Sequence, residues 1–153
     1  MKTTIPQWLV EKGQTLALHT EDFSSLPLDD DFRQIVVGQV ELASGNASVA
    51  VRDRAPSEIM GPRYIEVGGS VNFTITFKSP IYFLSMGIAG DWQDIEYRYD
   101  GNSGVFSQFY SAYDGDDPKR IDTWFSQPVK SLYVHVMSES SVCRFGSLTF
   151  QSV

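Results

Sequence analysis

The chain has 153 residues, a formal net charge of -7, 42% hydrophobic residues and one cysteine. A chain of this length buries enough apolar surface to fold as one domain, and a single cysteine excludes a scaffold of internal disulfides. The acidic charge argues against a general nucleic-acid binder and against electrostatic capture by an anionic membrane, because both partners are themselves negatively charged.

We therefore expect one domain over residues 1–153, in which 1–31 form a partly irregular N-terminal segment. The acidic stretch 21–31 is expected to cross the surface as a long loop. No apolar run approaches the roughly 18–20 residues of a membrane span, and residues 1–8 lack the apolar core of a signal peptide. These features assign no single location: they suit the cytoplasm, a phage particle, a signal-free export route or a module of a larger protein.

Short segments that alternate apolar and polar residues recur along the chain, separated by clusters of turn-forming residues. The clearest is 71–78, and 94–99, 131–136 and 143–150 show the same period of two, which is typical of strands with one face in a core. Weaker strands are predicted over 15–19, 34–43, 47–51, 64–67, 81–88, 105–110 and 121–125. The predicted core comprises Val71, Phe73, Ile75, Phe77, Ile95, Tyr97, Leu132, Val134, Val136, Leu148 and Phe150.

Three turn signals refine this pattern. Ser44-Gly45-Asn46 is predicted to join the strands 34–43 and 47–51 as a tight hairpin. The run from Asp100 to Gly104 predicts a second hairpin after the strand 94–99. Gly146 interrupts the alternation of the last strand, so we expect a β-bulge there.

Two segments resemble each other at an offset of 48 residues: Phe77-Lys78-Ser79-Pro80-Ile81 and Phe125-Ser126-Gln127-Pro128-Val129. Proline has no N–H for a central sheet position, so each segment predicts a corner at which the chain leaves one sheet and enters the facing one. Two such corners favour an all-β fold, a two-sheet antiparallel jelly-roll β-sandwich of eight to ten strands. A chance likeness between two strand-turn-strand units is the alternative.

The same corners contribute to a family resemblance. Phe77–Ile81, the pair Gly90-Asp91, the end Tyr99-Asp100-Gly101 and the closing run Gly146–Phe150 together resemble the galactose-binding-like jelly rolls of bacterial surface proteins and non-catalytic carbohydrate-binding modules. The resemblance covers residues 70–151, roughly half of the chain by length. It implies a sugar-binding role and often one structural calcium ion, but it matches no single residue to a defined ligand position.

The residues themselves offer the chemistry that sugars need, which is an exposed aromatic ring beside polar groups. Trp92 lies in the polar stretch 90–94, which is expected to be a loop, and Tyr110 and Tyr113 stand beside an acidic cluster. We expect Trp92, Tyr110 and Tyr113 to stack on sugar rings, with Asp91, Arg98 and Asp114 pairing with hydroxyl groups. The alternative is that Trp92 and Tyr113 fold back as lids over the ends of the sandwich.

Asp114, Asp116 and Asp117 supply hard oxygen ligands and are weak candidates for one structural calcium ion. Pro118 follows directly and no EF-hand glutamate is present, so a solvated turn is the competing interpretation. The two histidines, His19 and His135, and the one cysteine, Cys143, show no zinc spacing.

No phosphate loop, dinucleotide fingerprint or nucleophile elbow is present, and we expect no enzymatic activity. The predicted function is a non-catalytic, lectin-like module that binds a glycan or cell-surface saccharide, without nucleic acid or membrane insertion. The alternatives are a structural or adhesin component of a phage particle or surface assembly and, less favoured, a small hydrolase. Tyr133 and His135 lie on a predicted outer face and are candidates for a homo-oligomer contact.

Overall fold

The computed structural model describes residues 16–28, 31–45, 49–53, 62–68, 72–90, 92–99, 102–105, 119–136 and 142–152, together with Gln7. For 89–90, 92–99, 102–105, 119, 121, 126, 134–136 and 142–143 it describes the backbone alone. In chain order the strands are β1 (Ala17–Glu21), β2 (Asp31–Phe32), β3 (Gln34–Val37), β4 (Val40–Ser44), β5 (Val49–Arg52), β6 (Tyr64–Gly68), β7 (Asn72–Gly90), β8 (Trp92–Tyr99), β9 (Asn102–Val105), β10 (Lys119–Val136) and β11 (Val142–Ser152).

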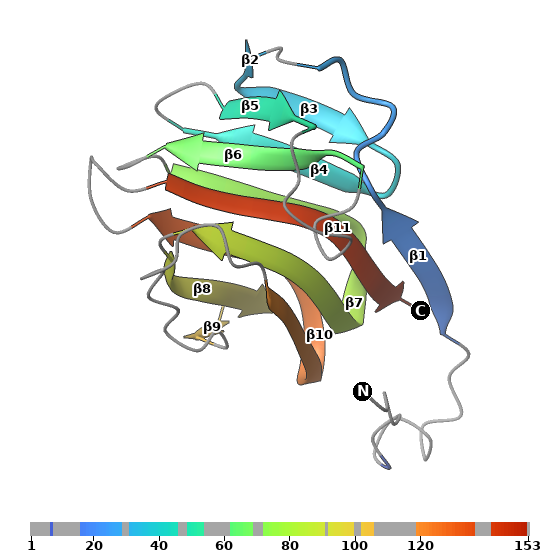
Figure 1. The fold of residues 1–153 in the computed structure, drawn as a ribbon. Coiled ribbons are helices and arrows are strands. Elements are labelled where there is room, and N and C mark those ends of the chain that lie inside the picture. The colour runs from blue at the N-terminus through green and yellow to red at the C-terminus, as the bar shows by residue number, and fades with distance from the viewer. Residues whose placement is uncertain are drawn as a thin grey trace.

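These strands form two layers that are joined through two long strands (Figure 1). In the first layer, β3, β4, the first half of β7, the second half of β10, β8 and β9 pair in that order. In the second layer the order is β2, β5, β6, β11, the second half of β7 and the first half of β10, and β1 pairs with the end of β11. Every pairing is antiparallel, which confirms the predicted all-β sandwich.

The two proline corners are confirmed. β7 pairs with β4 up to Phe77 and with β11 from Ile81 onward, so it changes layer at Ser79-Pro80. β10 changes layer beside the corner of β7, since the register between the two strands shifts between Trp124 and Val129. The apolar residues that flank each proline are buried, which anchors both corners in the core; they are Phe77, Ile81, Phe125 and Val129. The strands continue through the corners, whereas the sequence suggested separate strands on either side.

The core lies between the layers and is rich in phenylalanine. Rings of the first half of β7 meet rings of β11 across it, with centroid distances of 5.2 Å for Phe73–Phe145 and 5.1 Å for Phe77–Phe150. The predicted core residues whose side chains the structure describes are all buried, and these are Phe73, Ile75, Phe77, Leu132, Leu148 and Phe150. Val71, Ile95, Tyr97, Val134 and Val136 lie outside the described side chains.

One predicted strand and one predicted hairpin are wrong. The segment 34–43 is two strands, β3 and β4, which pair with each other from Val37↔Val40 outward, so the turn lies at Gly38-Gln39. Ser44–Asn46 does not join paired strands, because β4 pairs with β3 and β7 whereas β5 pairs with β2 and β6. The apolar run from Ile35 to Val37 concealed the turn, and the only local signal was Gly38.

Two other turn features are confirmed. β8 pairs with β9 from Tyr99↔Asn102, so these two strands form the hairpin expected after 94–99, and Asn102, Ser103 and Gly104 belong to its second strand. In β11 the register against β7 shifts between Phe145 and Leu148, which is the bulge expected at Gly146.

Gly38 provides a sharp test of the β3–β4 turn. Its φ of +56° lies in the left-handed region, and a Cβ there would stand 2.5 Å from Oε1 of Glu21. We expect Gly38→Ala to lower the free energy of unfolding by about 1–2 kcal/mol, because a left-handed conformation costs an L-residue roughly that much. Gly38→Asn is the matched control, since asparagine tolerates this conformation better. Urea denaturation measures the free energy of unfolding of both variants. Equal stability of Gly38→Ala and the parent protein would contradict the left-handed conformation assigned to Gly38.

The acidic stretch 21–31 does not simply cross the surface. Phe23 and Leu26 within it belong to the core cluster. Phe23 has a φ of 61°, unusual for a residue with a side chain, and its N–H donates to Oε2 of Glu21 at 2.9 Å. Its ring meets Phe145 edge-on at 6.1 Å, so the burial of the ring offsets the backbone strain. The side chains of Phe23 and Leu26 therefore hold this segment against the sandwich.

Within the described residues, no helix has the length and apolarity needed to cross a bilayer.

Candidate functional site

The sequence-predicted ligand residues fall on different parts of the chain. Trp92 is the first residue of β8, so it lies in a strand and not in the loop that was expected. Arg98 lies further along β8, opposite Ser131 of β10. The other four, Asp91, Tyr110, Tyr113 and Asp114, lie outside the described residues, as do Asp116 and Asp117. Among the described residues, no three His, Cys, Asp or Glu side chains are grouped closely enough to hold a metal ion.

A candidate site that the sequence did not indicate lies on the outer face of the second layer, which is the face turned away from the core. Strand register aligns two rows of side chains across β10, β7, β11 and β1. The first, called here the aromatic row, consists of Trp124, Phe83, Gln151 and Leu18. The second, called here the polar row, consists of Asp122, Ser85, Thr149 and Thr20. Their strand neighbours Leu84, Met86 and Phe150 point into the core, so both rows occupy the opposite face.

Trp124 and Phe83 form the centre of the aromatic row. Their ring centroids are 4.8 Å apart with the planes inclined at 45°, and Trp124 is only partly buried. Phe83 is 4% exposed although it is not part of the core cluster, because it packs beneath the indole on the outer face. At the other end of the row Leu18 is 64% exposed. The apolar surface that the row exposes is thus the indole of Trp124 at one end and Leu18 at the other, and an indole face is the kind of surface on which the C–H face of a sugar ring packs.

The indole nitrogen of Trp124 is a donor without an acceptor. Nε1 is buried and makes no hydrogen bond in the structure. An unmade hydrogen bond at a buried donor costs about 1–3 kcal/mol, and such groups are uncommon in folded proteins. Because Nε1 is buried, a ligand on the outer face meets the ring of Trp124 and not this donor.

Arg120 supplies charge to the polar row. Its side chain crosses from β10 over β7, where Nε donates to Oγ of Ser85 at 2.6 Å, and Nη2 lies 3.4 Å from Oγ1 of Thr149 on β11. This position explains why Ser85 is buried on an outer face. Asp122 stands one pleat further along β10 on the same face. Arg120 and the polar row together therefore offer a guanidinium, a carboxylate and hydroxyl groups, which are the donors and acceptors that hydroxyl groups of a sugar require.

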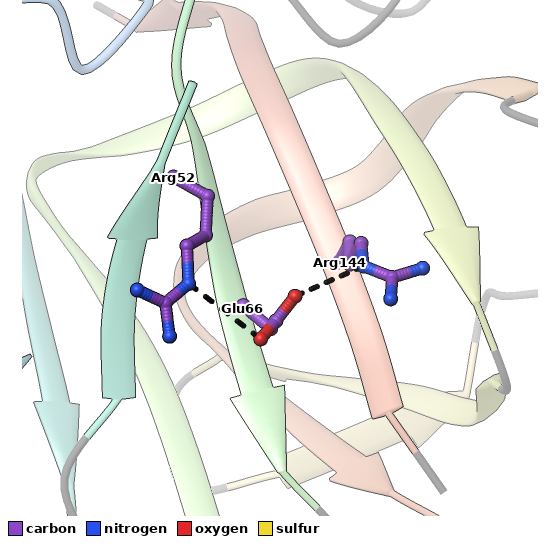
Figure 2. Close-up of polar contacts among 3 residues, drawn as sticks. All are labelled: Arg52, Glu66 and Arg144. Carbon is purple, nitrogen blue, oxygen red and sulfur yellow. Dashed lines mark hydrogen bonds and ion pairs between the residues drawn. The ribbon is translucent and has the colours of Figure 1, made fainter. Parts of the chain in front are cut away.

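A second polar group occupies the same outer face nearer to β5, and it is called here the arginine cluster: Arg52, Glu66 and Arg144 (Figure 2). Glu66 on β6 lies between the two arginines. Nε of Arg144 on β11 donates to Oε2 at 3.1 Å, and Nε of Arg52 on β5 is 3.7 Å from Oε1. The three side chains are between 25% and 37% exposed. Solvent screens such pairs, so their contribution to folding stability is small.

Tyr64 lies beside the arginine cluster on β6, two residues before Glu66. Burial raises the pKa of its hydroxyl above the ordinary 10.0, and the negative charge of Glu66 raises it further, whereas Arg144 and Arg52 act in the opposite direction. The folded protein therefore holds this proton more tightly than the unfolded chain does. Its stabilising effect is complete below the ordinary pKa and declines as the pH rises above that value.

This shift predicts alkaline instability that depends on one hydroxyl. The free energy of unfolding should fall between about pH 9 and pH 11, and Tyr64→Phe should make that fall shallower, because phenylalanine has no proton to lose. Urea denaturation across this range measures the effect. The other tyrosines and lysines titrate in both proteins, so the difference between the two curves isolates Tyr64. Parallel curves would show that Tyr64 titrates alike in the folded and unfolded chains.

Of the two residues predicted to contact a second copy, Tyr133 and His135, only the side chain of Tyr133 is described. Tyr133 donates its hydroxyl to Oδ1 of Asn72 at 2.6 Å, on the outer face of the first layer. The side chain of His135 lies outside the described part of the chain. Tyr133 thus has an intramolecular partner, and its contact with a second copy stays a prediction.

The comparisons with known proteins find likeness in structure only. No protein-family model matches the chain, and no curated protein matches it. Among solved structures, the K2 cleaved adhesin domain of Lys-gingipain has a TM-score of 0.59 at 11% sequence identity, covering 88% of this chain and 97% of that one. A variant of CBM29-2, a family 29 carbohydrate-binding module, has a TM-score of 0.54 at 11% identity, covering 90% of this chain and 91% of that one. Another family 29 variant has a TM-score of 0.50 at 10% identity, with coverages of 90% and 92%. These similarities confirm the β-sandwich fold that the sequence predicted.

Proposed function

We propose that the protein is a non-catalytic carbohydrate-binding module that holds a glycan on the outer face of its second layer. The observation that supports this most directly is the partly exposed indole of Trp124, which packs on the buried ring of Phe83 beside the polar row. Sugar rings present apolar faces and hydroxyl groups together, and this surface offers an apolar row directly beside a polar one. The fold is shared with carbohydrate-binding modules and with an adhesin domain, which is compatible with the proposal.

Each row has a defined role. The indole of Trp124 packs against the face of a sugar ring, and the buried ring of Phe83 supports the indole from below. Arg120 donates to hydroxyl oxygens, and Asp122 accepts from hydroxyl protons. Ser85 and Thr149 fix the guanidinium of Arg120, which lowers the entropic cost of ordering it when a ligand binds. No step in this scheme breaks a bond, so the role is binding alone.

A glycan array followed by isothermal titration calorimetry tests the function. We expect binding to at least one class of oligosaccharide, unchanged when a chelator removes divalent ions if the outer face alone forms the site. Loss of binding with the chelator would instead support the calcium ion proposed at Asp114, Asp116 and Asp117. Absence of binding to every glycan on the array would reject the function.

A second proposed sugar site is the set of ligand residues that the sequence predicted, namely Asp91, Trp92, Arg98, Tyr110, Tyr113 and Asp114. Trp92→Ala tests it beside the outer-face variants. A loss of affinity in Trp92→Ala with none in Trp124→Ala would move the site to the β8 side of the molecule.

A structural or adhesin role in a surface assembly is the second candidate, favoured by the likeness to an adhesin domain. It predicts a defined oligomer at micromolar concentration, which light scattering measures. If the protein is a strict monomer that binds glycan, the carbohydrate-binding function stands and the assembly role is contradicted.

A further inference from the structure

The aromatic row runs across the strands of the second layer and not along one of them. Each of four neighbouring strands, β10, β7, β11 and β1, contributes one side chain to it: Trp124, Phe83, Gln151 and Leu18. Neighbouring strands lie about 4.8 Å apart, so roughly 14 Å separates Trp124 from Leu18. Leu18 is 64% exposed and the indole is half-buried, whereas Phe83 beneath the indole is buried. The row therefore exposes apolar surface at each of its two ends.

The polar row follows the aromatic row across the same four strands. On every strand its member stands two residues from the member of the aromatic row, which is roughly 6.6 Å along the strand. From β10 to β1 its members are Asp122, Ser85, Thr149 and Thr20. The two rows therefore have the same direction and the same repeat, and each strand places a polar side chain beside its member of the aromatic row.

The repeat of the two rows is close to that of an extended glycan. Successive rings of such a glycan are about 5 Å apart, and the strands are about 4.8 Å apart. A glycan that lies across the strands therefore keeps one ring over each strand, with the hydroxyl groups of one side toward the polar row. A glycan that lay along β10 would leave the aromatic row after about one ring, because same-face side chains repeat every roughly 6.6 Å and the next one is Asp122.

Resting on the proposed function, we infer that the site takes a linear glycan of about four rings or more, laid across β10, β7, β11 and β1. One ring packs on Trp124, and the third ring beyond it packs on Leu18 at the far end of the row. The ring on Leu18 removes aliphatic surface from water, which is a favourable contact that a shorter glycan does not reach. Leu18 is therefore the residue that sets the preference for length, and the ligand is a segment of an extended polysaccharide and not a single terminal sugar.

Titration calorimetry with oligosaccharides of increasing length tests the number of rings. The probes are β-1,4-linked oligomers of glucose and of mannose, from one to six rings, together with the same series of any other linear glycan that the array identifies. We expect the affinity to rise about tenfold or more between two rings and four, and to level off beyond that length.

Two variants of the row locate the effect at its two ends. Leu18→Ala should weaken binding of the four-ring oligomer about fivefold and leave the affinity for the two-ring oligomer unchanged. Trp124→Ala should weaken binding of both lengths. The matched control is Val36→Ala, which shortens an aliphatic side chain that is 56% exposed on β3 of the first layer, and it should bind both lengths as the parent protein does. Thermal melting verifies that each variant is folded.

The outcomes separate this inference from the function on which it rests. The cross-strand glycan is overturned if the affinity stops rising at two rings, if folded Leu18→Ala binds the four-ring oligomer as the parent does, or if Val36→Ala loses as much affinity as Leu18→Ala. In each of these cases a loss of binding in Trp124→Ala would keep the outer face as a site for a shorter sugar. If neither the oligomers nor any glycan on the array binds, the glycan-binding function is wrong and the inference is wrong with it.

Discussion

Phe145→Ala is expected to lower the free energy of unfolding by about 3–5 kcal/mol, the range found for truncating a buried phenylalanine. Phe145 is completely buried, on β11 of the second layer. Its ring contacts Phe73 of the first layer at 5.2 Å and Phe23 of the acidic stretch at 6.1 Å. Alanine would leave a cavity where three separate parts of the chain meet, and close packing on all sides limits how far the cavity can collapse.

Urea denaturation measures this loss, with the slope of the unfolding curve compared between proteins to verify that the unfolded states match. Val36→Ala is the control, because Val36 is 56% exposed on the edge strand β3, and we expect it to change stability by less than about 0.5 kcal/mol. A loss below about 1 kcal/mol in Phe145→Ala would contradict the assignment of this ring to the centre of the core.

Trp124→Ala is expected to weaken glycan binding by about tenfold to thirtyfold, since a central aromatic anchor typically contributes about 1.4–2 kcal/mol or more. The affinity of Trp124→Phe should lie between those of the parent protein and Trp124→Ala, because phenylalanine keeps an aromatic face on Phe83 but is smaller than the indole. Titration calorimetry with the glycan found on the array measures both. The two variants thus show how much of the affinity depends on the area of the aromatic face.

The control for this prediction is Tyr133→Phe, which alters an aromatic residue on the outer face of the first layer and removes its hydrogen bond to Asn72. It should bind glycan as the parent protein does. Thermal melting accompanies each titration, because Trp124→Ala also removes packing on Phe83. Undiminished affinity in folded Trp124→Ala would exclude the aromatic row from the site.

Local patterns along the chain determined the fold class. In 71–78 a period of two places Phe73, Ile75 and Phe77 on one face, and those side chains are buried. The repeated Phe-x-x-Pro-[Ile/Val] segment marked both layer changes, because proline lacks the N–H that a continuous ladder would use. Each of these inferences needs only residues that are near one another in sequence.

The alternation of apolar and polar residues was lost in three segments. Ile35, Val36 and Val37 read as the middle of one strand, and the turn at Gly38 was missed. The residues from Ile81 to Leu84 gave no alternation, so nothing separated Phe83 from the core-facing residues around it. The acidic stretch appeared solvated because its charges outnumber Phe23 and Leu26, yet those two side chains decide its path.

The sequence by itself determined a two-layer β-sandwich, its corners and most of the described core, because alternation and proline act within a few residues. Only the tertiary structure brought Trp124 onto Phe83, Arg120 onto Ser85, and Arg52 and Arg144 onto Glu66. The physical reason is register: strands far apart in the chain pair antiparallel at one alignment, and a shift of one residue would send each of these side chains to the opposite face.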